Sequence, residues 1–193
     1  MHKVYLSASS QLTDAYTLAL DIYESGYRPD FVVGVWRGGA PIAIAIQEML
    51  AWLGVTTDHI AIRSTSYTGI NQRDRDIRVH NLDYLQERLR PEHQLLLVDD
   101  VFDTGLSLEK VITELKRCCR NNTPGIKIAT TWFKPANNQT QMQPDFYLHT
   151  SDDWLVFPHE LAGLELSEAL ANKEELKPLG QRLARYMAKP MTT

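Results

Sequence analysis

The chain has 193 residues, enough to bury one sizeable hydrophobic core. Hydrophobic residues make up 44% of the sequence and charged residues 23%, as is usual for a globular protein. The formal net charge of −4 argues against a general nucleic-acid-binding surface, although it leaves room for a local basic patch. The longest apolar stretch, from Ala40 to Ala45, is too short to span a bilayer, and the first residues do not form a signal peptide pattern. We therefore expect a cytoplasmic protein with no membrane or nucleic-acid partner.

Strand-like and helix-like segments alternate along the chain. The first half predicts a helix at 10–25 that ends at Gly26, a strand at 31–36, a helix from about Pro41 to Gly54 and a strand at 60–62. The second half predicts a short helix at 82–89, a strand at 95–98, a helix at 106–119, a strand at 126–133 and a helical segment at 166–188. Between the halves, residues 64–80 are polar with little apolar periodicity, so we expect an exposed loop.

The order of these segments predicts the fold class. Continuous apolar strands separated by helices indicate an α/β fold whose parallel sheet is buried on both faces. No internal repeat or low-complexity linker divides the sequence, so we expect a single domain over residues 1–193. Ligands of such sheets collect beyond the carboxyl ends of the strands, where the chemically interesting residues should follow.

The only two cysteines, Cys118 and Cys119, are adjacent in a predicted helix. Neighbours on a helix point about 100° apart and make a poor disulfide, and a lone pair lacks the spacing of a zinc site. We expect two buried or half-buried thiols.

An acidic and glycine-containing segment follows the strand at 95–98. It reads Asp99-Asp100-Val101-Phe102-Asp103-Thr104-Gly105-Leu106-Ser107 and leads into a helix. The glycine allows close approach of an anion, the free amides of the helix start point towards it, and Thr104 and Ser107 add hydroxyl donors. Carboxylates beside a phosphate become favourable when a divalent cation and sugar hydroxyls lie there too. The simpler alternative is a helix cap, but a cap needs one such residue, and no Walker A loop or dinucleotide-binding turn is present.

A second candidate anion site follows the strand at 31–36. Arg37-Gly38-Gly39 offers a tight turn with exposed amides and a fixed positive charge, and Pro41 suits the first turn of a helix. Taken on its own, this segment favours an ordinary strand-to-helix turn with a solvated arginine.

The stretch 96–105, Leu-Leu-Val-Asp-Asp-Val-Phe-Asp-Thr-Gly, closely resembles the phosphoribosyl pyrophosphate motif of type I phosphoribosyltransferases. The resemblance implies that Asp99 and Asp100 hold the ribose hydroxyls and organise Mg²⁺. It also implies that residues 103–107 cradle the 5′-phosphate and that Asp103 is the general base near the purine N7. Arg37, Gly38 and Gly39 resemble the family's pyrophosphate loop, which implies a cis peptide at Trp36–Arg37.

The polar stretch 64–78 resembles the flexible loop that closes over the site in this family, with Ser66-Tyr67 as the matching pair. Closure of such a loop, at about 64–80, would exclude water from an oxocarbenium-like centre.

The last third of the chain resembles the base-binding hood of hypoxanthine, guanine and xanthine phosphoribosyltransferases. Here Lys134 would donate to O6 of the base, Trp154 would stack on the ring and the Leu155 carbonyl would face position 2. Glu160 would help to hold a second Mg²⁺ through water. Taken singly, such a lysine is usually a solvated residue and such a tryptophan a core residue.

Together, these resemblances imply a short bacterial or archaeal type of 6-oxopurine phosphoribosyltransferase, with a small hood built from about 1–10 and 134–165. The partners would be phosphoribosyl pyrophosphate, a purine base and further copies of the chain in a dimer or tetramer. The rival interpretation is a non-catalytic regulator on the same fold that senses phosphoribosyl pyrophosphate or nucleotides. A third, the same chemistry on orotate or uracil, is disfavoured by Lys134 and Trp154.

Overall fold

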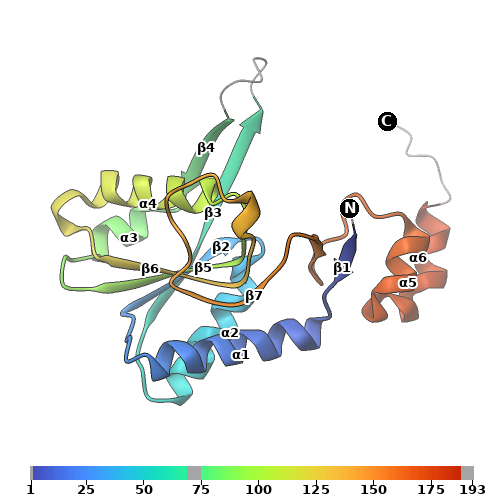
Figure 1. Cartoon of the computed structure of the whole chain (residues 1–193), viewed down its shortest axis with the longest axis horizontal. Coiled ribbons are helices and arrows are strands. Elements are labelled where there is room, and N and C mark those ends of the chain that lie inside the picture. Colours follow the sequence, from blue (N-terminus) through green and yellow to red (C-terminus); the bar gives the residue numbers. More distant parts are fainter. Residues whose placement is uncertain (1, 69–74, 188–193) are drawn as a thin grey trace. The chain divides into compact units, whose positions relative to one another are not determined.

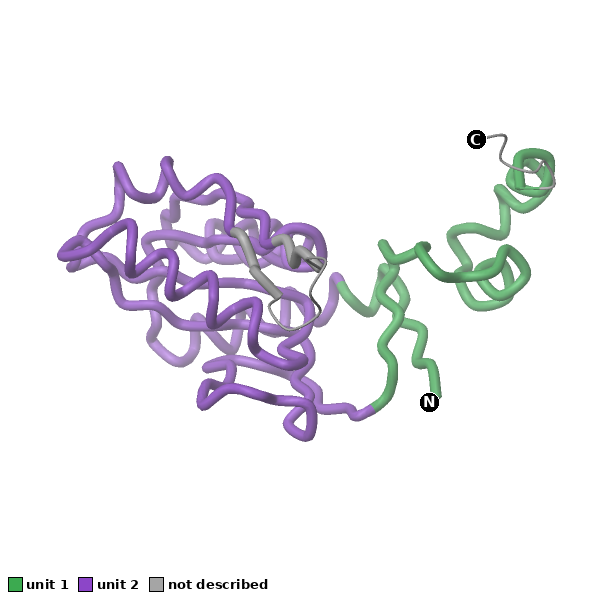
Figure 2. Tube along the Cα trace, turned by 90° about the horizontal axis from the view of Figure 1, so that it is seen from above, with its two compact units in different colours: residues 1–11, 153–193 green, residues 12–152 purple. Residues whose placement is uncertain are grey.

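The computed structural model describes residues 2–68 and 75–187, and only the backbone of residues 65–68 and 75–78 (Figure 1). The chain falls into two compact units (Figure 2). Unit 1 joins Met1–Gln11 to Asp153–Thr193, and unit 2 is Leu12–Asp152.

The centre of unit 2 is a mostly parallel sheet. Among the described residues it has six strands in the order β4-β3-β2-β5-β6-β7. Only the β3–β4 pair is antiparallel. The strands are β2 (Phe31–Trp36), β3 (Asp58–Thr68), β4 (Arg75–His80), β5 (Gln94–Phe102), β6 (Gly125–Phe133) and β7 (Phe146–Thr150). The α/β prediction with a parallel sheet is confirmed.

Helices cover both faces of this sheet, as Figure 1 shows. On one face, α1 (Ala8–Glu24) and α2 (Gly39–Trp52) pack on Val32 and Leu96; on the other, α3 (Asp83–Arg88) and α4 (Leu106–Cys119) pack on Val33 and Leu97. Consecutive residues of a strand point to opposite faces, so a run such as 95–98 is wholly buried. Because β2, β5 and β6 are parallel, the loops after them leave from one edge of the sheet.

The polar stretch 64–80 differs in part from its predicted loop. β3 continues to Thr68 and β4 begins at Arg75, and the two strands pair with Ser66 opposite Ile77 and Tyr67 opposite Asp76. An antiparallel ladder is held by backbone hydrogen bonds, so it can form without the apolar periodicity on which the sequence prediction relied. Residues 69–74 lie outside the described part.

Unit 1 combines an N-terminal and a C-terminal segment. Strand β1 (Lys3–Tyr5) pairs in parallel with β8 (Trp154–Val156), so these two segments form one small structure. It also contains α5 (Leu166–Asn172), a 3₁₀ segment at Glu174–Leu179 and α6 (Gly180–Met187). The predicted single helix at 166–188 is thus interrupted, with Lys173 extended and Pro178 unable to donate a backbone hydrogen bond. Residue 188 lies outside the described part.

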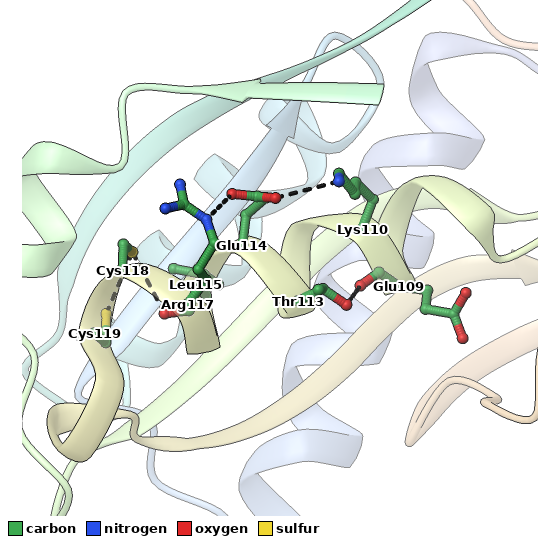
Figure 3. A network of polar contacts seen from close by, with 8 residues as sticks. All are labelled: Glu109, Lys110, Thr113, Glu114, Leu115, Arg117, Cys118 and Cys119. Carbon is green, nitrogen blue, oxygen red and sulfur yellow. Dashed lines mark hydrogen bonds and ion pairs between the residues drawn. The ribbon is translucent and has the colours of Figure 1, made fainter. Parts of the chain in front are cut away.

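The surface of α4 carries a local charge network (Figure 3). The Glu114 carboxylate lies 2.7 Å from Arg117 Nε and 3.2 Å from Lys110 Nζ. The hydrogen bond from Arg117, with help from Lys110, lowers the pKa of Glu114. At its end, α4 carries the predicted free thiols, with Cys118 Sγ and Cys119 Sγ 3.7 Å apart, and burial raises the pKa of Cys119 to about 12.

Within residues 2–68 and 75–187, we find no helix with the length and apolar character needed to cross a membrane.

Candidate active site

The two predicted anion-binding segments lie directly against each other at the edge of the sheet. A Cβ atom on Gly38 would lie 1.8 Å from Asp100 Oδ2, and one on Gly39 would lie 2.2 Å from the carbonyl oxygen of Val98. At Gly39 the obstacle is strand backbone, so glycine is required there, whereas a side chain at Gly38 would have to displace the Asp100 carboxylate. Arg37, which precedes this turn, is exposed. The residues that follow β2 thus meet the end of β5.

The acidic pair lies within β5, because the strand runs on to Phe102 instead of ending at Val98. Backbone amides of Asp100 and Gly39 donate to the Asp99 carboxylate, and the Val101 amide donates to Asp100 Oδ1 at 2.8 Å. Burial, and then the charge of Asp100, raise the pKa of Asp99 well above its usual value. Two adjacent carboxylates that disfavour each other's charge form a site that a cation would stabilise.

A hollow lies beside the acidic pair. It has a volume of about 210 Å³ and is lined by residues 99–105, 107 and 108. Gly105 has φ of +78°, and a Cβ atom there would lie 2.6 Å from the Phe102 ring. α4 starts immediately afterwards without a side-chain cap, and the Leu106 amide makes only a 3.4 Å contact with Thr104 Oγ1. The amides of the first helical turn therefore remain available for an anion.

Asp103 and Lys134, which follow the adjacent strands β5 and β6, come together in unit 2. Lys134 Nζ lies 3.8 Å from Asp103 Oδ2. The lysine is only 8% exposed, whereas the aspartate side chain is 44% exposed. The backbone amide of Lys134 donates to the Phe102 carbonyl at 2.9 Å, which fixes the start of the lysine loop beside the acidic segment. A buried cationic donor thus lies beside an accessible carboxylate.

Asn137 is a site residue that the sequence analysis missed. Its side-chain amide donates to Asp103 Oδ1 at 2.8 Å. In the sequence, the only signal was a polar amide three residues after the lysine at the end of a strand.

A larger hollow of about 450 Å³ lies between α4 and β6, lined by residues such as Ile112, Lys116 and Ile128. Its one carboxylate, Asp145, accepts a hydrogen bond from the Ile128 amide at 2.8 Å. This hollow contains none of the predicted site residues, so the chemistry belongs to the smaller one.

Comparisons with known proteins agree with this geometry. The family model described as "Phosphoribosyl transferase domain" matches residues 5–164. The chain belongs to this family. It is a phosphoribosyltransferase, an enzyme that transfers a phosphoribosyl group.

One solved structure above 30% identity agrees with this family, and two less similar ones share the fold. A purine phosphoribosyltransferase from Pyrococcus horikoshii is 31% identical with a TM-score of 0.68, and the match covers 86% of this chain and 99% of that one. The xanthine-guanine-hypoxanthine phosphoribosyltransferase of Helicobacter pylori is 22% identical with a TM-score of 0.66, and 93% and 99% are covered. A hypothetical protein from Neisseria gonorrhoeae with bound ppGpp is 18% identical with a TM-score of 0.67, over 94% and 97%. No curated protein sequence matches the chain.

The phosphoribosyltransferase carries the other predicted site residues as follows. Ser66 and Tyr67 lie on β3, and the Trp36–Arg37 peptide bond is cis, as the resemblance implied. Leu106 is the first residue of α4 and does not line the 210 Å³ hollow.

The remaining three residues lie in unit 1. Trp154 is 54% exposed, and Lys3 Nζ lies 5.7 Å from its ring centroid. Leu155 is buried in β8, where it pairs with Val4. Glu160 Oε2 accepts a hydrogen bond from the Phe157 amide of its own turn at 3.1 Å. Asp99 and Asp100, the other predicted metal ligands, belong to unit 2.

The donor set of the phosphoribosyltransferase is suited to Mg²⁺. In the described ranges, no three His, Cys, Asp or Glu side chains gather into a ready-made metal cage. Mg²⁺ typically takes one or two carboxylates, several waters and substrate phosphates. Asp99 and Asp100 provide two carboxylates that line the 210 Å³ hollow at the start of α4, so the residues present fit this ion.

Proposed function

We propose that this phosphoribosyltransferase joins a 6-oxopurine base to phosphoribosyl pyrophosphate, giving a nucleoside monophosphate and pyrophosphate in purine salvage. Hypoxanthine and guanine are the expected bases, xanthine a weaker one and adenine a poor one. The observation that carries this proposal is the pairing of Lys134 with Asp103, 3.8 Å apart.

This pairing matches one edge of a 6-oxopurine. O6 and N7 lie side by side on that edge, so a donor and a proton acceptor are needed next to each other. The Lys134 ammonium has donors and no acceptors, which suits O6. The Asp103 carboxylate is the group that takes the N7 proton as the new bond to the ribose forms.

Phosphoribosyl pyrophosphate would bind along the residues from the end of β5 to the start of α4. Asp99 and Asp100 would hold Mg²⁺, which would supply charge neutralisation for the departing pyrophosphate. The amides at the start of α4, with Thr104 and Ser107, would bind the 5′-phosphate. Arg37, Gly38 and Gly39 would bind the pyrophosphate.

The remaining predicted residues would serve base binding and closure. Trp154 would stack on the base, the Leu155 carbonyl would face position 2, and Glu160 would reach a second Mg²⁺ through water. Ser66 and Tyr67 would belong to a cover that excludes water on closure.

Base selection provides the experiment. Lys134 donates to a 6-oxo group but meets another donor at the 6-amino group of adenine. A buried charged donor left unpaired costs at least ~1–3 kcal/mol, so adenine should be used tenfold to a hundredfold less efficiently. A panel of bases with the donor sugar and Mg²⁺, followed by pyrophosphate release, measures this ratio.

The variant Lys134→Ala should narrow the ratio of activity with hypoxanthine to activity with adenine, because it removes the hydrogen-bond donor that distinguishes these two bases. Lys116→Ala is the matched control, since Lys116 is exposed on α4 and makes no ion pair in the described part of the chain. If the wild-type enzyme prefers adenine or orotate, the proposed base is wrong. If no base turns over while nucleotides still bind, the regulatory alternative is favoured instead.

A further inference from the structure

The loop after β6 is fastened to the backbone on both sides of Asp103. At its start, the Lys134 amide donates to the Phe102 carbonyl at 2.9 Å, and at its end, the Gln139 amide donates to the Thr104 carbonyl at 3.0 Å. Phe102 and Thr104 are the two neighbours of Asp103 in the chain. The middle of the loop, a 3₁₀ turn at Pro135–Asn137, is therefore held beside the Asp103 side chain.

The two oxygens of the Asp103 carboxylate have different partners. Asn137 Nδ2 donates to Oδ1 at 2.8 Å, whereas Lys134 Nζ lies 3.8 Å from Oδ2. The terminal torsion of an aspartate is broad, so an unrestrained carboxylate samples many orientations. A charge-assisted hydrogen bond to one oxygen restricts that torsion and leaves the other oxygen on the side of the lysine.

The hydrogen bond from Asn137 to Asp103 is not needed to hold the loop in place. The two backbone hydrogen bonds already fix the loop ends, and Asn137 is exposed, so its side chain adds little burial. The next residue has the structural role: Asn138 Nδ2 donates to the Met142 carbonyl at 2.7 Å, and Asn138 Oδ1 accepts from the Thr140 amide at 2.9 Å. Asn138 thus stabilises the loop itself, whereas Asn137 contacts Asp103.

We infer that Asn137 is a positioning residue, which holds the Asp103 carboxylate so that Oδ2 faces the edge of the base. This inference rests on the proposed function, in which Asp103 takes the proton from N7. Asn137 itself need not touch the substrate. Its effect should therefore fall on turnover rather than on binding.

Steady-state kinetics of three Asn137 variants test this inference. Asn137→Ala should lower kcat about tenfold, the effect of one lost hydrogen bond to a charged group, and leave KM for base and donor within about twofold. Asn137→Asp keeps the shape but loses the donor and adds a like charge, so kcat should fall at least as far. Asn137→Gln restores an amide on an exposed loop and should recover part of the loss.

Two controls separate positioning from loop stability. Gln139→Ala removes an exposed side chain from the same loop and leaves its backbone bond to Thr104 in place, so kcat should not change. The melting temperature of Asn137→Ala should equal that of the wild type. An unchanged kcat in Asn137→Ala, a raised KM in place of the lowered kcat, or a full loss in Asn137→Gln would each overturn the inference.

A double variant distinguishes this inference from the proposed function. Asp103→Asn alone should lower kcat by about 10² to 10⁴, because the amide cannot accept the proton. Adding Asn137→Ala should then have no further effect, since the group that it positions no longer reacts. If Asp103→Asn has normal turnover, the proposed base role fails. If Asp103→Asn is impaired but the two losses simply multiply, the positioning role alone fails.

Discussion

At the scale of single residues, Gly38 and Gly39 differ in what surrounds them. A methyl group on Gly39 would meet the Val98 carbonyl oxygen at 2.2 Å and the Asp99 Cα atom at 2.8 Å, both of which belong to the backbone of a central strand. A methyl group on Gly38 would meet the Asp100 carboxylate, with its closest oxygen at 1.8 Å. A strand backbone cannot move without disturbing the sheet, whereas a carboxylate can rotate.

We therefore predict that alanine affects stability at one of these positions and donor binding at the other. Gly39→Ala should destabilise the fold by about 1–3 kcal/mol, as overpacking does, and lower the melting temperature. Gly38→Ala should leave stability nearly unchanged but displace Asp100, so Mg²⁺-dependent donor binding should weaken about tenfold. Thermal unfolding and calorimetry with the donor sugar measure the two effects. Equal melting temperatures for the two variants would contradict this account of the turn.

Part of the site could be predicted from the sequence at this scale. Asp103 and Lys134 each follow an apolar strand, and adjacent parallel strands bring such residues to one edge. Asn137 could not be predicted in the same way. Its contact with Asp103 depends on the path of the loop, which is set by backbone bonds to Phe102 and Thr104. Backbone hydrogen bonds leave no mark on the choice of side chains.

At the scale of elements, one carboxylate joins strand β1 to helix α5 in unit 1. Glu168 Oε1 accepts hydrogen bonds from Lys3 Nζ, at 2.5 Å, and from the Tyr5 hydroxyl. The bond from Lys3, followed by that from Tyr5, lowers the pKa of Glu168. The same contact raises the pKa of Tyr5 from 10.0 to about 12. Lys3 also faces the ring of Trp154. The bond between Lys3 and Glu168 therefore supports Trp154, the residue expected to stack on the base.

The pH dependence of unit 1 follows from these two shifts. A carboxylate with a lowered folded-state pKa stabilises the fold above its ordinary value, 4.5 for Glu168, and loses that contribution as the pH falls through its folded value. A tyrosine with a raised pKa contributes fully below its ordinary value of 10.0, and the contribution disappears as the pH rises towards 12.

We predict that Glu168→Gln melts at a lower temperature than the wild type between these limits. The difference between the two proteins should shrink below pH 4.5 and above pH 10. Melting curves across this pH range provide the measurement. Glu92→Gln is the control, because Glu92 is exposed and its side chain makes no hydrogen bond in the described part of the chain. A pH-independent difference would show that Glu168 acts through packing and not through its charge.

Elements with clear apolar periodicity were predicted closely, and polar ones were not. The strand at 31–36 and the helix at 106–119 have the observed bounds, because buried apolar runs and helix-ending signals mark them. The β3–β4 hairpin was missed, since its polar strands are held by the backbone ladder. The break after α5 was missed too, because a single extended residue, Lys173, has no signature in the sequence.

At the scale of the whole molecule, the distribution of charge predicts that donor binding depends on a cation. The chain has a net charge of −4, and its candidate site contains three aspartates, Asp99, Asp100 and Asp103. Arg37 and Lys134 are the cationic residues that we assign to the site within unit 2. A substrate that carries several phosphate charges would meet repulsion from the acidic pair unless a divalent ion lies between them. The protein therefore provides cationic side chains for the substrate, but a divalent ion is needed to offset the charge of the acidic pair.

The resulting prediction is that the donor sugar stabilises the protein only together with Mg²⁺. A ligand at 100 times its Kd adds about 2.7 kcal/mol to the free energy of unfolding. For a chain of this size, this is a rise of roughly 5–10 °C in melting temperature, at about 2–4 °C per kcal/mol. A chelator, or the variant Asp100→Ala, should remove most of the rise, whereas Asp21→Ala, which alters an exposed carboxylate on α1, should retain it. An equal rise with and without Mg²⁺ would mean that phosphate binding at the start of α4 needs no cation, and the role assigned to Asp99 and Asp100 would then be wrong.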